Sequence, residues 1–111
     1  MTIFEKIIAR QIPAKIIWES EDAIAFEDVN PQAPVHILIV PKNAISRLAE
    51  AKDEDASVLG GLLLAARDIA KKLDLSGGYR VVINNGPDAG ESVPHLHVHL
   101  LGKRALAWPP G

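Results

Sequence analysis

The chain has 111 residues, of which 48% are hydrophobic and 23% are charged, a composition that is ordinary for a single globular domain. It has no cysteine and a formal net charge of −2. This excludes a disulfide framework and a thiolate metal site, and it gives no support to binding of a nucleic-acid polymer. No apolar run reaches the length of a membrane span, and the first residues lack the apolar core of a signal peptide. We therefore expect one domain over residues 1–111, in the cytoplasm, with neither a membrane nor a nucleic-acid polymer as partner.

The first forty residues predict a short helix followed by three strands. Apolar residues at Ile3, Phe4, Ile7 and Ile8 mark an amphipathic helix that stops before Pro13. The segments that follow are rich in β-branched residues and are separated by turn-forming residues. We expect them to form two strands of a hairpin (15–19 and 23–27), a loop (30–34) and a central strand (35–40).

The second half predicts one long helix and two more strands. The segment from Asp53 to Leu73 carries a broad apolar stripe, with acidic residues at its start and lysines at its end, as the helix dipole favours. Its interior pair Gly60-Gly61 lowers the stability of the helix by about 1 kcal/mol per glycine relative to alanine. Close packing of the glycines against another backbone would justify this loss. We expect further strands at 79–84 and over 94–101. Together these elements predict an α+β fold, a five-stranded, largely antiparallel sheet with one long and one short helix packed on one side.

Three of the four histidines alternate near the C-terminus, at His95, His97 and His99. This spacing is typical of a half-exposed strand, so the three imidazoles should share one face while Leu96, Val98 and Leu100 lie on the other. Side chains two residues apart on a strand are about 6.6 Å apart. A neutral imidazole is a nucleophile, and clustered imidazoles disfavour one another's protonation, which keeps one ring available. The run therefore predicts the functional site.

A zinc site is a second interpretation of the same run. A His-x-His spacing on a strand is a known arrangement of zinc ligands, and three imidazoles with a water molecule form a hydrolytic centre. Alternating strand positions point their rings side by side rather than toward one point, and no fourth type of ligand is obvious nearby. Both features weaken the interpretation.

Further candidates lie outside the run, and each also has an ordinary structural explanation. His36 lies in the most apolar strand. It is either a core histidine with its hydrogen bonds satisfied or a site residue, the latter if its face of the strand meets the face that carries the three alternating histidines. Gly90 and Ser92 belong to a loop whose N–H and hydroxyl groups suit a phosphate oxygen, or they form a simple turn. Asp28 would accept hydrogen bonds from sugar hydroxyls or cap a turn, and Asn84 is either a site donor or a polar strand end.

Residues 95–101, His-Leu-His-Val-His-Leu-Leu, match the pattern His-φ-His-φ-His-φ-φ at every position, where φ is apolar. In this motif the chain resembles the histidine triad (HIT) superfamily. The resemblance covers essentially the whole chain and is closest to the Hint branch, the histidine triad nucleotide-binding proteins. The segments that carry it are 2–8, 12–15, 26–34, 36–42 and the terminal Trp108-Pro109-Pro110-Gly111.

The resemblance implies a homodimer in which two five-stranded sheets join into one ten-stranded sheet. It implies binding of purine nucleotides and hydrolysis of nucleoside 5′-phosphoramidates to a nucleoside monophosphate and an amine, with no metal and no other cofactor. It also implies that Trp108 reaches toward the partner subunit's site and shapes the choice of leaving group. The identity of the amine is left open. The preference for adenine or guanine is also left open, because aliphatic pocket residues hold a purine without contacting its edge.

The resemblance also implies roles for individual residues. His97 is implied as the nucleophile that forms a nucleotidyl-histidine intermediate, and His99 as the contact of the phosphate and the leaving group. His95 and His36 are implied to orient or tune the nucleophile through hydrogen bonds. The other implied roles are phosphate or leaving-group contacts for Ser92, Asn84 and Gly90, ribose binding for Asp28, and a base and ribose pocket formed by Phe4, Ile7, Phe26, Val29 and Leu38.

Three residues depart from the family's usual pattern. Glu91 stands where relatives commonly have glutamine, Lys103 replaces a second glycine after Gly102, and Pro94 occupies a position that is often aromatic. A negative charge at Glu91 would weaken binding of an anion to the loop unless the side chain points away. The alternative hypothesis is therefore a nucleotide-binding or scaffold protein with weak residual hydrolase activity.

Overall fold

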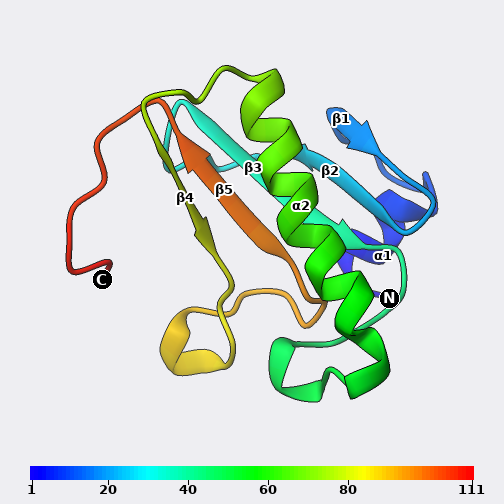
Figure 1. Cartoon of the computed structure of the whole chain (residues 1–111). Helices are drawn as coiled ribbons and strands as arrows, with labels where there is room; N and C mark the ends of the chain where they lie inside the picture. Colours follow the sequence, from blue (N-terminus) through cyan, green and yellow to red (C-terminus); the bar gives the residue numbers. More distant parts are fainter.

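A five-stranded antiparallel sheet is the framework of the molecule, in a computed structural model that describes all of residues 1–111. The strand order is β1-β2-β3-β5-β4, and every neighbouring pair is antiparallel. The elements are α1 (Ile3–Ile8), β1 (Ile16–Glu19), β2 (Ala23–Glu27), β3 (Val35–Pro41), α2 (Ala56–Lys72), β4 (Tyr79–Val82) and β5 (Val98–Gly102) (Figure 1). The predicted α+β fold with one long and one short helix is confirmed. No helix is long and apolar enough to cross a membrane.

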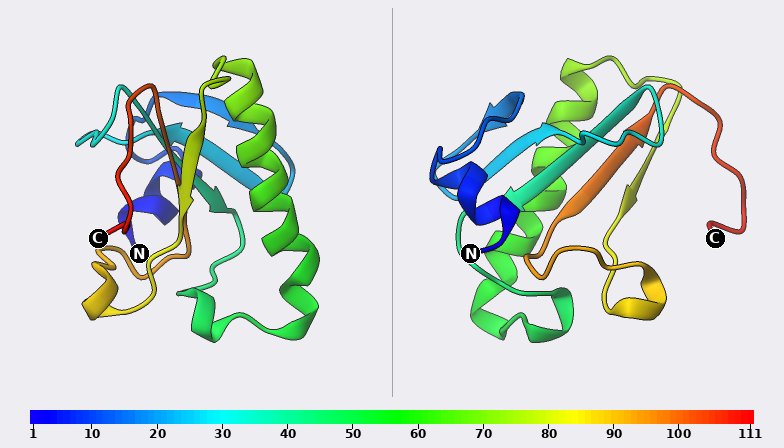
Figure 2. Two further views of the ribbon diagram at one scale, coloured as in Figure 1. Left: turned by 60° about the vertical axis from the view of Figure 1, so that its left-hand side comes forward. Right: turned by 180° about the vertical axis from the view of Figure 1, so that it is seen from behind.

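The two helices cover opposite faces of the sheet, so the prediction that they pack on one side is wrong. Figure 2 shows α2 along one face and α1 against the other. On the α2 face, Ile37 and Ile39 of β3 belong to a core of 14 buried residues. On the α1 face, Leu38 and Val40 of β3 join a smaller cluster whose other members are Phe4, Ile7, Ile24 and Phe26. Successive strand residues point to opposite faces, and β3 is apolar on both, because both are covered.

Several predicted boundaries shift by a few residues. The segment Asp53–Asp55 forms a separate 3₁₀ turn, so α2 begins only at Ala56. The strand predicted at 79–84 ends at Val82, and the histidine strand predicted at 94–101 begins at Val98 and ends at Gly102. His95 and His97 therefore precede the regular ladder of β5.

The glycine pair in α2 packs against no other segment of the chain. Gly60 and Gly61 are exposed, and a Cβ added to either would meet no atom within 4 Å. The glycine that a neighbour does require is Gly102, where an added Cβ would lie 2.9 Å from each terminal methyl carbon of Leu75. Within this chain, close packing against another backbone therefore does not account for Gly60-Gly61.

Candidate active site

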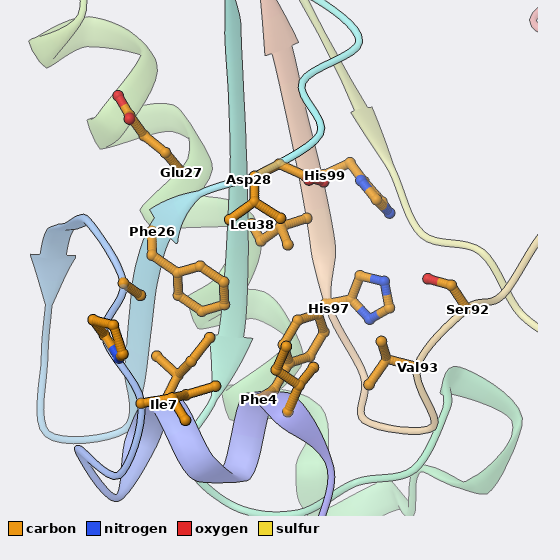
Figure 3. A pocket seen from close by; sticks show the side chains of 15 residues that line it. Phe4, Ile7, Phe26, Glu27, Asp28, Leu38, Ser92, Val93, His97 and His99 are labelled. Carbon is orange, nitrogen blue, oxygen red and sulfur yellow. The ribbon is translucent and has the colours of Figure 1, made fainter.

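A cavity of about 250 Å³ opens on the α1 face of the sheet, beside the start of β5. Its floor and walls come from α1, β2, β3 and the loop that precedes β5 (Figure 3). Nine of the predicted site residues line it: Phe4, Ile7, Phe26, Asp28, Val29, Leu38, Ser92, His97 and His99. Six further lining residues were not predicted as site residues: Ile3, Ile12, Pro13, Ala14, Glu27 and Val93. The cavity thus joins an apolar half to a polar half that contains two imidazoles, a carboxylate and a hydroxyl.

Five other predicted residues do not line this cavity. His36 and His95 are buried behind it. Gly90 provides the left-handed turn at the end of its loop, with φ at 87°, and Asn84 is half-buried without contact to the cavity. Trp108 is 81% exposed in the C-terminal segment. The implied contact of Trp108 with a partner subunit is therefore compatible with its exposure but stays a prediction.

The histidine run keeps the predicted alternation, but His95 and His97 are buried and only His99 is partly exposed. Leu96, Val98 and Leu100 all belong to the large core on the α2 face. The rings of His97 and His99 lie on the opposite face with their centroids 5.0 Å apart. His95 and His97 are only 1% and 5% exposed, because α1 covers them. The ring of Phe4 meets that of His97 edge to face, with centroids 4.9 Å apart.

A backbone carbonyl determines which ring nitrogen of His97 carries the hydrogen. The Nδ1 atom of His97 lies 2.7 Å from the carbonyl oxygen of His95, and because a carbonyl only accepts, Nδ1 must carry the hydrogen. A neutral His97 ring then has its lone pair on Nε2, which has no hydrogen-bond partner within the protein. Figure 3 shows this ring at the cavity beside Ser92. The result is a buried imidazole with a free basic nitrogen.

The ring of His95 anchors the same segment from behind. Its Nε2 atom lies 2.9 Å from the carbonyl oxygen of Pro41 and donates to it. The next residue is held as well, because Leu96 N–H donates to the carbonyl of Ile45 at 2.6 Å. His95 therefore contacts the ring of His97 through its own backbone carbonyl, while its own ring fixes the entry to β5.

A second chain of hydrogen bonds ends at His99. The backbone N–H of Gln32 donates to Nδ1 of His36 at 3.0 Å, so a neutral His36 carries its hydrogen on Nε2. The Nε2 atom of His36 lies 2.9 Å from Nδ1 of His99 and donates its hydrogen to it. Because Nδ1 of His99 is the acceptor, a neutral His99 carries its own hydrogen on Nε2. The implied role of His36 is thereby corrected, because its ring contacts His99 and not the ring of His97. Asp28 is the other neighbour, with Oδ2 3.4 Å from Nε2 of His36.

Both histidines of this chain are held neutral. Burial, and then the nearby charges of His97 and His36, lower the pKa of His99 to about 4, against the opposing effect of Asp28. Burial also lowers the pKa of His36 against the opposing charge of Asp28. Loss of hydration disfavours the charged imidazolium in each case. At neutral pH the site therefore presents His99 as a neutral donor.

One group of three residues could hold a metal ion, but this group is not formed by the three alternating histidines. Asp28, His36 and His99 each offer one ligand atom, and these atoms lie within 4.8 Å of one another. His95 is turned away toward Pro41, so the zinc interpretation in which His95, His97 and His99 converge is wrong. A carboxylate and two imidazoles are suitable zinc ligands.

The loop before the triad is closed by an ion pair that sequence reasoning missed. Glu91 does not project freely toward the site. Its carboxylate accepts from Nε of Arg47 at 3.0 Å and from Nη2 at 3.1 Å. It also accepts from the backbone N–H of Gly86 at 3.1 Å. Arg47 and Glu91 are 44 positions apart in the sequence, and no local pattern points to such a pair.

Comparisons with known proteins agree with this geometry. The profile of the HIT domain family matches residues 9–106. A 14 kDa zinc-binding protein from Zea mays is 52% identical over 112 residues, which cover 99% of this chain and 88% of that protein. A HIT family hydrolase from Legionella pneumophila has a TM-score of 0.97 and 41% identity, with 100% of both chains covered. A histidine triad nucleotide-binding protein from Candida albicans has a TM-score of 0.84 and 31% identity over 98% of this chain and 83% of that one.

Proposed function

Because this chain belongs to the HIT domain family, we propose that it is a purine nucleotide-binding hydrolase that cleaves the P–N bond of nucleoside 5′-phosphoramidates. The observation that carries the proposal is the fixed tautomer of His97, whose Nδ1–H is donated to the carbonyl of His95. This bond leaves Nε2 as a free lone pair at a cavity lined by a hydroxyl and a second imidazole donor. A solved relative from Candida albicans is named for nucleotide binding, and its similarity supports the same ligand class here.

The cavity suits the three parts of a nucleotide. Phe4 and Phe26 form an edge-to-face pair with centroids 5.6 Å apart, and these rings with the aliphatic walls fit the flat, apolar faces of a purine. Asp28 stands at the cavity rim as an acceptor for ribose hydroxyls. The hydroxyl of Ser92 makes no hydrogen bond within the protein and is free to donate to a phosphate oxygen.

The reaction follows from the two tautomers. Nε2 of His97 attacks the α-phosphorus, so an N–P bond forms as the bond from phosphorus to the leaving nitrogen breaks. The Nδ1–H bond to the carbonyl of His95 stabilises the positive charge that develops on the ring. The leaving nitrogen takes a proton from water while Nε2–H of His99 donates a hydrogen bond to it. The hydroxide so formed attacks the nucleotidyl-histidine, releasing the nucleoside monophosphate and restoring His97.

The experiment is an adenosine phosphoramidate assay in the presence of EDTA. His97→Ala should lower turnover at least about 100-fold, since a nucleophile without a substitute is lost. Arg10→Gln, which alters an exposed ion pair with Glu19, is the matched control and should keep wild-type turnover. Rapid acid quench and mass measurement should find a nucleotidyl adduct on the wild type. Wild-type turnover by His97→Ala would contradict the assigned role.

We propose that the protein is a homodimer joined along β4. This strand is an edge of the sheet, and edge strands with free backbone groups pair readily with another copy. Val81 of β4 is paired with Leu100, which faces α2, and both Val81 and Tyr79 are exposed on that side. Leu63 and Leu64 of α2 are also about half exposed. Sedimentation should therefore give twice the chain mass, and Val81→Lys should shift it to the monomer.

Two other functions have tests of their own. A binding or scaffold protein with weak residual activity would bind AMP tightly by calorimetry and show negligible turnover. A zinc protein is favoured by the cluster of Asp28, His36 and His99 and by the name of the Zea mays relative. Metal analysis of protein purified without a histidine tag tests it, and loss of turnover on chelation would favour zinc over the proposed metal-free reaction.

A further inference from the structure

Arg47 lies outside the cavity but holds the charged residue next to it. Its planar guanidinium meets the carboxylate of Glu91 through two nitrogens, in the two-pronged geometry that gives strong ion pairs. The Glu91 side chain is only 11% exposed and that of Arg47 is 32% exposed, so the carboxylate is shielded from solvent on the inner side of the pair. The pKa of Glu91 is held below its usual value, first by the hydrogen bond from Arg47 and then by that from Gly86. Glu91 is therefore a carboxylate at every pH at which the protein would act.

The same pair ties the phosphate loop to a neighbouring segment. Glu91 closes the loop on itself, since its carboxylate accepts from Gly86 N–H and its own N–H donates to the Gly86 carbonyl at 3.2 Å. Ala49 N–H donates to the side-chain oxygen of Asn85 at 2.7 Å. Both ends of the loop are thus attached to the chain around Arg47, and Ser92 is the next residue after the attachment.

Glu91 also places a negative charge next to the site of an anion. It immediately precedes Ser92, which lines the cavity, and a charge on His97 is near enough to lower the pKa of Glu91. A phosphate group between Ser92 and His97 would be repelled by an uncompensated carboxylate at this position. Arg47 supplies the compensating positive charge without entering the cavity.

We propose that Arg47 is a positioning residue of the phosphate site, which neutralises Glu91 so that an anionic phosphate can bind against Ser92. The inference rests on the proposed nucleotide function. It separates two effects of the ion pair. Removing Arg47 leaves a lone carboxylate beside the phosphate, whereas removing the charge of Glu91 leaves a lone cation, which does not repel an anion. The two single variants should therefore behave differently, although they break the same pair.

The test compares AMP with adenosine, which has the same base and sugar but no phosphate. Calorimetry on Arg47→Gln should show AMP affinity lowered about 10-fold and adenosine affinity changed by less than about 2-fold, with the AMP loss shrinking at high salt. Glu91→Gln should bind AMP within about 2-fold of wild type. The double variant should recover most of the loss, because neither charge remains. Arg10→Gln is the matched control and should bind both ligands as wild type does.

A purely structural role predicts other results. With such a role, Arg47→Gln and Glu91→Gln would lower the affinity for AMP equally, and the double variant would show no recovery. That pattern would overturn the inference. Arg47→Lys keeps the charge but loses the two-pronged geometry, so it should retain AMP affinity even if its melting temperature falls. This variant replaces Arg47→Gln in the test if Arg47→Gln does not fold. Failure of the wild type to bind AMP would overturn the proposed function and the inference together. Equal AMP binding by wild type and Arg47→Gln would overturn the inference alone.

Discussion

Acidification should destabilise the protein through His99. A histidine in the unfolded chain has a pKa of 6.5, whereas that of His99 in the folded protein is about 4. Between these values the unfolded chain binds a proton that the folded protein does not, so the free energy of unfolding falls as the pH falls from about 6.5 to about 4. The cost from His99 is close to zero at about pH 7.5 and amounts to about 2 kcal/mol at about pH 5, at 1.36 kcal/mol per pKa unit. His36, whose pKa is also lowered by burial, adds to the loss in the same direction.

Urea unfolding of wild type and His99→Gln at several pH values measures this effect. Protein concentration is kept constant, because a dimer's midpoint depends on it. The variant cannot titrate at this position, so its stability should fall by about 2 kcal/mol less than that of wild type between about pH 7.5 and about pH 5. Burial and Asp28, not His99, shift the pKa of His36, so its contribution should remain in both proteins. Parallel pH profiles of the two proteins would refute the reasoning.

Three further predictions concern stability, and thermal or urea unfolding measures each of them. Thr2→Ala should cost about 1 kcal/mol, because the Thr2 hydroxyl accepts from Glu5 N–H at 3.1 Å in a capping box that starts α1; no change would mean that the cap contributes nothing. Gly102→Ala should cost about 1 kcal/mol or more, since its Cβ would press on Leu75 at 2.9 Å. Gly60→Ala should stabilise α2 by about 0.5–1 kcal/mol, because nothing lies within 4 Å of the added carbon, and a loss would instead place Gly60 against another chain.

Local patterns predicted the elements and the faces of the histidine run, but not how the layers are arranged. The alternation from His95 to His99 correctly placed imidazoles and leucines on opposite faces, since that depends only on strand geometry. The opposite placement of the two helices was missed, although β3 is apolar on both faces, and a strand covered on one side alone would not be. A helix as short as α1 carries too few residues for its periodicity to show which face of the sheet it covers.

Contacts between distant segments account for most of what the sequence did not predict at the site. The bond from His36 to His99 depends on the register of β3 against β5, in which Leu38 is paired with His99 and His36 is the next residue on the same face. Periodicity within one strand does not contain that register. The pairing of Arg47 with Glu91 is equally non-local, and it shows where the Glu91 side chain points, which the sequence left open. Its carboxylate is held by Arg47 and by Gly86.

Dividing the apolar interior between two faces of one sheet gives the protein a modular construction. The cluster of six under α1, which includes Phe4 and Leu38, forms much of the cavity wall, while the 14 residues under α2 do not line it. Only β2 and β3 contribute to both clusters. Substitutions in separate clusters act nearly independently on stability. Substitutions can therefore reshape the cavity while the larger hydrophobic layer continues to stabilise the fold.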